Sequence, residues 1–283
     1  MLRQCDIAMI GGDVAVPHGV PPDMTLRHTR SLPLLAALAG VAVAGSAHAQ
    51  SQDDGSRHQG WSIGLAAAWS PSPYKRYDNK AWPLPLVNYE GKSFYFRGAT
   101  IGYKLYSSPS DEISIAVSPN GDRFRHEDTR DPQMKQLSNR NIGAMAGFAW
   151  RHSATWGFIE ANASKKVTGN GGGTRYDLGY GYAIPAGKLT LIPKVGISRS
   201  DSHLNNYYYG ISAREAARSG LPFYRAGGGN APYVDLSAVY RFTPKWTAIG
   251  GVRYSKLPDA IKNSPMVDAD DSKSFFFAIN RAF

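Results

Sequence analysis

Cysteine is almost absent from this sequence, since Cys5 is the only one among 283 residues. A disulfide framework and a zinc site built from several thiolates both need more than one cysteine. The sequence therefore excludes both, and the folded chain must be stabilised in another way.

Acidic residues are scarce relative to basic ones. The chain has 22 Asp and Glu against 32 Lys and Arg, which gives a net charge of +10 at pH 7. An excess of positive charge favours anionic partners. For an exported chain these would be lipopolysaccharide phosphates, anionic cell-wall polymer or anionic solutes, and we expect no nucleic acid.

Long hydrophobic runs are limited to Ser31–Ala44, which is shorter than the roughly 20 residues that a membrane-spanning helix needs. Arg27 and Arg30 precede this run, and Ala47 and Ala49 follow it. A basic start, a short apolar core and small residues before the cleavage point are typical of a secretory signal peptide. We therefore expect cleavage after Ala49 rather than a buried helix or a membrane anchor.

The first 23 residues do not suit the start of a signal peptide, because they contain Asp6, Asp13 and Asp23. We expect translation to begin at Met24 and the preceding residues to be an extension of the gene model. Three Arg and three Asp lie before the cleavage point, so the charge of +10 belongs to the mature chain. The predicted parts are a signal peptide over 1–49, a periplasmic N-terminal segment over 50–60 and an outer-membrane β-barrel over 61–283.

The mature chain consists of stretches in which apolar residues alternate with small or polar ones. Successive side chains of a strand point to opposite faces of the sheet, so each stretch predicts a strand with one apolar face. A soluble sandwich also alternates, but segments of about ten residues with aromatic ends are typical of outer-membrane strands. We therefore predict an all-β fold, an antiparallel transmembrane β-barrel. The clearest stretches are 61–69, 99–106, 142–150, 175–184 and 235–242.

Long and short connections alternate strictly along the chain. Bacterial barrels have short periplasmic turns and longer outer loops, so the long connections near 121–138, 167–173, 200–231 and 258–271 are predicted to face outward. Short turns are predicted at 107–111, 151–154, 185–188 and 243–245. With strands near 61–69, 82–89, 92–98 and 99–106, we expect twelve strands in all. The alternative is ten.

The last segment is an alternating apolar strand that closes on an aromatic residue. Such an ending resembles the recognition signal of the barrel-assembly machinery, which is therefore an expected partner together with outer-membrane lipid. Arg281 departs from the pattern, and we expect it to reach the periplasmic interface. The residues of the signal are Phe275, Phe277, Ile279 and Phe283.

The segment Tyr207–Tyr224 resembles the MipA/OmpV family of outer-membrane proteins. The family has a tyrosine-rich strand end, then a Gly-Val/Ile-Ser turn, a Glu-Ala pair, Ser-Gly-Leu and Tyr, and this segment follows that order. Further matches lie at 226–229, 257–260, 263–267, 83–86 and Tyr89, so the resemblance covers about 60–283. It implies location in the outer membrane of a Gram-negative bacterium. It also implies a scaffold that joins a murein-degrading lytic transglycosylase to a penicillin-binding protein, with peptidoglycan as the setting.

The 207–224 segment also predicts a local structure. Ser212 followed by Glu215 is a capping box, and Gly220 ends a helix of about two turns. Such a helix in a long outer loop could constrict the barrel mouth, or it could stabilise only its own loop. The residues of this candidate constriction loop are Tyr207, Tyr208, Tyr209, Ser212, Glu215, Gly220 and Tyr224.

Basic residues outnumber acidic ones on the predicted lumen face. This ratio suggests a narrow anion-preferring channel or ligand-binding barrel, since rings of basic residues select anions. The alternative is a plugged lumen in which the charges pair with each other. The candidate lumen charges are Arg97, Lys104, Glu160, Arg175, Asp177, Lys194, Asp235, Arg241 and Arg253.

The sequence shows no recognisable catalytic motif. The mature histidines His58, His126, His152 and His203 fall in predicted turns or loops without a positioned partner, and no His-Glu-x-x-His motif or phosphate loop occurs. We therefore expect no enzyme, no metal site and no cofactor. A scaffold is the leading functional hypothesis, a porin-like barrel is the alternative, and an outer-membrane hydrolase is the least favoured.

Overall fold

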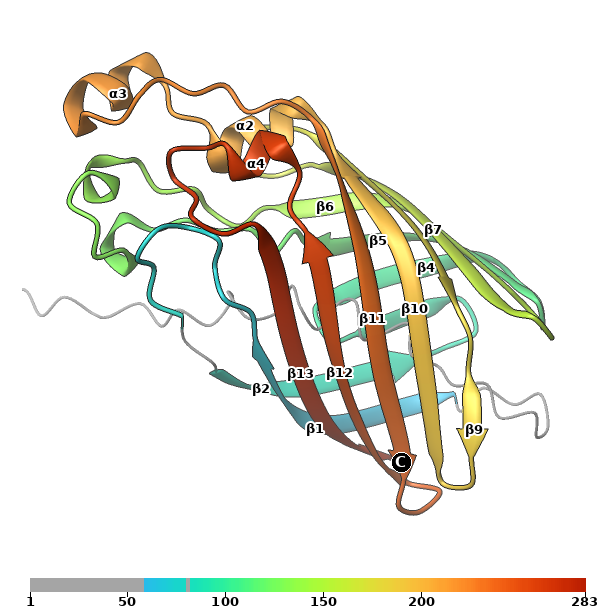
Figure 1. Cartoon of the computed structure of the whole chain (residues 1–283). Coiled ribbons are helices and arrows are strands. Elements are labelled where there is room, and N and C mark those ends of the chain that lie inside the picture. The colour runs from blue at the N-terminus through green and yellow to red at the C-terminus, as the bar shows by residue number, and fades with distance from the viewer. Residues whose placement is uncertain (1–58, 80–81) are drawn as a thin grey trace, which may run out of the picture. The chain divides into compact units, whose positions relative to one another are not determined.

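A computed structural model describes residues 59–79 and 82–283 of the chain (Figure 1). The predicted signal peptide and almost all of the 50–60 segment lie outside the described residues. Among the described residues there is no helix long and apolar enough to cross a membrane.

The strands form one antiparallel sheet that closes on itself. β1 (Gly60–Trp69) pairs with β13 (Asp271–Ala282) on one side and with β2 (Trp82–Glu90) on the other. The short β9 (Ile184–Ala186) and β8 (Thr174–Gly181) both pair with β10 (Leu189–Ser200), so they share one position in the wall. The barrel therefore has twelve strands, as predicted. The others are β3 (Phe94–Arg97), β4 (Thr100–Ser107), β5 (Asp111–Pro119), β6 (Ala144–Ala154), β7 (Gly157–Lys166), β11 (Gly229–Arg241) and β12 (Trp246–Lys256).

The apolar face of the sheet points outward. In β1, Ile63 and Leu65 are exposed whereas Ala66 and Ala68 are buried, and Phe148 in β6 is 63% exposed. A soluble sandwich would bury these large side chains, but a barrel in lipid places them against hydrocarbon. The alternation therefore describes a membrane barrel and excludes the sandwich.

Two predicted turns are wrong in position. Arg151–Ala154 belongs to β6, where His152 pairs with Asp111 of β5, and the turn lies at 155–156. Ile184–Ala186 forms β9, which leaves a turn of two residues at 187–188. In both cases backbone pairing with the neighbouring strand extends the strand into residues whose side chains favour turns.

Within residues 59–79 and 82–283, the helices all lie in the long connections at one end of the barrel, which we call the loop end. The opposite end, with the short turns and Phe283, is the turn end (Figure 1). The two 3-10 helices of connection 120–143 are η2 (His126–Asp128) and η3 (Met134–Gln136). The α-helices are α2 (Ser202–Tyr209), α3 (Ala213–Ser219) and α4 (Asp259–Lys262).

Candidate functional site

Four long connections fold together at the loop end. We call them the loop cap: residues 70–79, 120–143, 201–228 and 257–270. They share a hydrophobic core, to which each connection contributes at least one buried side chain. Phe124, Met134, Tyr208 and Met266 are completely buried in it. Because apolar side chains from distant segments exclude water together, the loop cap is a packed unit rather than a set of separate loops.

Tyr208 joins three of these connections. Its hydroxyl accepts a hydrogen bond from the Asn120 side chain (2.7 Å) and donates one to the Asn141 carbonyl (3.0 Å). Its own carbonyl accepts a hydrogen bond from the Tyr74 hydroxyl at 3.1 Å. A buried tyrosine needs partners for its hydroxyl, and here the partners are segments far away in the sequence.

The three tyrosines 207–209 belong to the helix α2, whereas the family resemblance led us to expect a strand end. Asp201 caps this helix by accepting a hydrogen bond from the Leu204 N–H at 2.8 Å. Tyr207 points toward β7, where the Lys166 ammonium lies 3.6 Å from the centre of its ring. The helix therefore directs successive tyrosines into the core and onto the barrel wall.

The predicted capping box is present at α3. The Ser212 hydroxyl accepts a hydrogen bond from the Glu215 N–H (3.3 Å), and the Glu215 carboxylate accepts one from the Ser212 N–H (3.1 Å). Gly220 ends the helix in the left-handed region, with φ of 72°. Tyr224, further along, donates to the carbonyl of Ala260 at 3.1 Å and thereby links this connection to α4.

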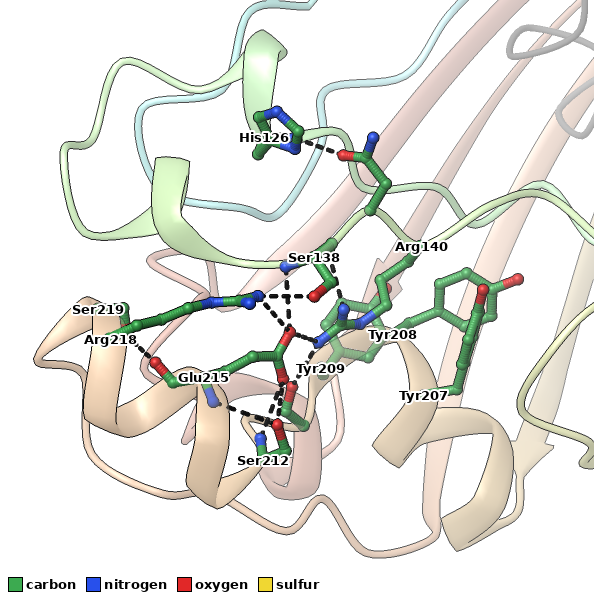
Figure 2. A network of polar contacts seen from close by, with 12 residues as sticks. His126, Ser138, Arg140, Tyr207, Tyr208, Tyr209, Ser212, Glu215, Arg218 and Ser219 are labelled. Atoms are coloured by element: carbon green, nitrogen blue, oxygen red, sulfur yellow. Dashed lines mark hydrogen bonds and ion pairs between the residues drawn. The ribbon is translucent and has the colours of Figure 1, made fainter. Parts of the chain in front are cut away.

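Glu215 also forms a buried ion pair with Arg140 of connection 120–143 (Figure 2). The two charged groups lie 2.8 Å apart, and each residue is less than a tenth exposed. The Ser138 N–H donates to the same carboxylate at 3.1 Å, and Arg140 donates to the Ser138 and Gly210 carbonyls. One carboxylate thus caps its own helix and holds the neighbouring connection.

The pKa of Glu215 is low because of these contacts. Burial by itself favours the neutral acid and raises the pKa. The Ser212 N–H, the Arg140 guanidinium and the Ser138 N–H stabilise the carboxylate more strongly, so the pKa falls from 4.5 to about 2. Sequence reasoning missed Arg140 altogether, because no local pattern marks a loop arginine whose partner lies 75 residues away.

Six of the nine predicted lumen charges lie in two clusters of ion pairs. In the first, Glu90 accepts hydrogen bonds from Arg97 (2.9 Å) and from Lys104, and Arg97 also contacts Glu112 at 3.4 Å. Glu90 and Glu112 were not among the predicted residues. Glu90 shares the strand parity of the inward Leu84 and Leu86, so alternation extended to the strand end would have identified it.

The second cluster takes its residues from five strands, β6, β7, β10, β11 and β12. Glu160 binds Arg151 (2.5 Å) and Lys194 (3.1 Å), and Asp235 binds Lys194 (3.7 Å) and Arg253 (2.6 Å). Arg151 was missed because the sequence placed it in a turn. In this cluster each basic group faces a carboxylate, so its charge is compensated inside the barrel.

The remaining predicted charges have different positions. Asp177 accepts a hydrogen bond from the Tyr233 hydroxyl at 3.0 Å, beside the second cluster. Arg175 binds Asp122 at 2.6 Å and so connects the wall to the loop cap. Arg241 is the last residue of β11 and lies at the turn end.

The predicted assembly signal lies at the seam where the barrel closes. Phe275 and Phe277 are exposed on the outer face. The Phe283 N–H donates to the Trp61 carbonyl at 3.1 Å, which extends the pairing of β13 with β1. The Arg281 guanidinium lies 5.4 Å from the centre of the Phe283 ring, at the turn end.

No metal centre is formed by the described side chains, since no three metal-ligating groups gather anywhere in residues 59–79 and 82–283. The barrel interior contains paired charges, and the barrel wall continues into the folded loop cap. Both ends of the barrel present surfaces on which a partner could bind.

The chain is similar in sequence to known outer-membrane proteins. Residues 63–283 match the family model described as MltA-interacting protein MipA. The MltA-interacting protein of Escherichia coli strain K12 is 36% identical over 80% of this chain and 88% of its own length. The putative outer membrane protein YiaT of Escherichia coli O157:H7 is 38% identical over 78% of this chain and 90% of its own length. Among solved structures, the NanC porin aligns with 78% of this chain and all of its own, at 8% identity and a TM-score of 0.46.

Proposed function

Because the chain belongs to the MipA family of outer-membrane proteins, we propose that it is a membrane-anchored scaffold for murein-remodelling enzymes. The observation that carries the proposal is the similarity, along nearly the whole barrel, to a relative named for its interaction with MltA. The partners proposed are a lytic transglycosylase and, through it, a penicillin-binding protein. The barrel itself carries out no chemistry.

The turn end is the surface that we assign to this interaction, because murein and its enzymes lie in the periplasm. Its described turns expose Lys92, Lys188 and Lys245, and Arg281 lies beside them. The nearby carboxylate of Asp111 is engaged with His152 at 2.9 Å. Exposed lysines at the turn end attract an acidic surface, so the proposed partner docks through an acidic face.

The channel alternative receives less support from the contacts in the lumen. A selective anion pore needs basic groups that face the solute, but Arg97, Lys104, Lys194 and Arg253 are all engaged with carboxylates. The candidate constriction loop is part of the loop cap, and we propose that the cap narrows the outer mouth. A scaffold requires no open path and agrees with both features.

Co-purification from detergent-solubilised membranes tests the scaffold. We expect the wild-type barrel to retain a lytic transglycosylase, and Lys188→Glu combined with Lys245→Glu to lose it. Capture by the wild type should also weaken as salt rises, because exposed charges are screened.

The matched control reverses two exposed charges at the loop end, Lys135→Glu with Arg214→Glu, and should leave capture unchanged. Both variants should show the heat-modifiable gel mobility of a folded barrel. Equal capture by the two double variants would contradict the assignment to the turn end. Absence of any murein enzyme from the wild-type preparation would contradict the scaffold itself.

A further inference from the structure

The wall of the barrel is incomplete along one edge of β2. This strand pairs with β1 from Trp82 to Glu90, but it pairs with β3 only from Asn88 to Glu90. The β3–β4 hairpin turns back at Gly98, and β5 is not a neighbour of β2 in the sheet. Among the described strands, none therefore pairs with residues 82–87 on the β3 side. This edge is about 20 Å long at roughly 3.3 Å per residue.

The tip of the β3–β4 hairpin is held next to Asn88 of β2 by specific contacts. Gly98 adopts a φ of 61°, in the left-handed region that favours glycine. Its N–H donates to the Asn88 side chain at 2.9 Å, and the same side chain donates to the Ser62 hydroxyl of β1 at 3.2 Å. The Asn88 side chain of β2 thus binds the hairpin tip where the pairing of β2 with β3 ends. The short length of the hairpin is therefore fixed by specific contacts.

Two prolines lie on the unpaired edge. The Gly91 N–H donates to the Phe94 carbonyl at 2.9 Å, so by antiparallel alternation the odd-numbered residues of β2 direct their N–H toward β3. Pro83 and Pro85 share this parity and have no N–H to direct. Only Val87 keeps a donor on the open edge of residues 82–87, which disfavours the addition of a strand from another chain.

The inner face beside this edge is apolar. Leu84 and Leu86 point inward and are less than a tenth exposed, and the outward Pro83, Pro85 and Val87 face the lipid side. The first ion-pair cluster lies between Glu90, at the other end of β2, and the β3–β4 hairpin, and the second lies on other strands. An apolar surface therefore continues from the outside of the barrel to its interior. Its inner members are Ala66, Ala68, Leu84, Leu86, Phe276 and Ala278.

We propose that this edge is a lateral opening through which the acyl chain of a membrane amphiphile enters the barrel and packs on Leu84 and Leu86. Hydrocarbon forms no hydrogen bonds, and the edge presents it with one N–H and the carbonyls of residues 83, 85 and 87, two donors fewer than an ordinary strand edge of this length. A lipid-exposed strand edge is otherwise unfavourable, because its polar groups lack partners. The site differs from the turn-end surface and does not depend on it.

Photo-cross-linking tests the opening. The protein is folded into phosphatidylcholine vesicles in which one acyl chain carries a diazirine, illuminated, digested and mapped by mass spectrometry. We expect label on the inward Leu84, Leu86 or Phe276 as well as on the outward Val87. The matched controls are Ile192 and Val239, which are buried and inward but lie on β10 and β11.

Label that is confined to outward residues, or that reaches Ile192 and Val239 equally, would overturn the proposal. So would cross-linked dimers joined through β2. The variant Ala66→Trp should fill the apolar face and lower the labelling of Leu86 several-fold, with Val87 unchanged. The wild-type map decides the question even where this variant fails to fold.

Discussion

At the scale of single residues, the feature that organises the loop cap is the carboxylate of Glu215. It accepts hydrogen bonds from its own helix N-terminus, from Ser138 and from Arg140. Removing one partner of a buried ion pair is strongly destabilising, because it leaves an uncompensated charge away from water. The consequences are therefore testable by changing one atom or one charge.

Acidification should weaken the loop cap between about pH 4.5 and about pH 2. The pKa of Glu215 is lower in the folded cap than its ordinary 4.5, so its stabilisation is complete above that value and is lost as pH falls toward 2. Glu215→Gln should remove most of this dependence. The stability of the cap is measured by denaturing the detergent-folded protein at each pH. The signal comes from a fluorophore attached to a cysteine that replaces the exposed Arg214. An unchanged pH profile in Glu215→Gln would contradict the assignment.

Removal of one partner should cost more than removal of both. Arg140→Met removes the buried counter-charge 2.8 Å from the Glu215 carboxylate and leaves only the exposed Arg218 at 3.8 Å. We expect a loss of about 3 kcal/mol from the stability of the cap. Arg140→Met combined with Glu215→Leu should recover part of that loss. The same fluorophore follows both variants through a double-mutant cycle. A strictly additive pair would show that the two groups do not interact.

Residue patterns predicted these groups unevenly. Ser212, Glu215 and Gly220 were identified because a helix end is specified by residues three to eight positions apart. Arg140 and Tyr74 were not, because their contacts with Glu215 and Tyr208 join segments that no local rule connects. Strand alternation extended to the end of β2 would have identified Glu90. It could not identify Arg151, because the sequence placed that residue in a turn.

At the scale of elements, α3 depends on how it ends as well as on how it begins. Gly220 has a φ of 72°, and a side chain there is strained whatever space surrounds it. Gly220→Val should therefore destabilise the cap by about 1–2 kcal/mol. Gly172→Ala is the control, since that glycine has no such backbone angle and a Cβ would meet nothing within 4 Å. Equal effects of the two changes, measured with the same fluorophore, would contradict the explanation.

Strands were easier to predict than the helices. Alternation with a period of two located the wall and its twelve strands, since the lipid requires one face of every strand to be apolar. The helix α2 was missed because Tyr207–Tyr209 are aromatic residues that favour strands, and packing in the loop cap overrides that preference. The short β3–β4 hairpin was foreseen as two strands, but the open edge of β2 beside it was not.

At the scale of the whole molecule, the lumen contains paired charge. This arrangement predicts no anion-selective current from the wild type in planar bilayers, because the basic groups already face carboxylates. The current and its ion selectivity are also measured for the variants Lys194→Glu and Arg253→Glu. A wild-type current whose selectivity reverses in these variants would favour the channel and weaken the scaffold.

The two ends of the barrel have different construction, and this difference underlies the proposed function. The loop end has a hydrophobic core and a buried ion pair, whereas the turn end has short turns with exposed lysines. The first suits a closed outer surface, and the second suits a partner that approaches from the periplasm.

Site-specific cross-linking in cells tests the central claim most directly. A photo-cross-linker is attached to a single cysteine that replaces either Lys188 at the turn end or Arg214 at the loop end, both of which are exposed. The account predicts that a lytic transglycosylase is captured from position 188 and not from position 214. Capture from position 214 alone, or from neither position in cells that contain the folded barrel, would contradict it.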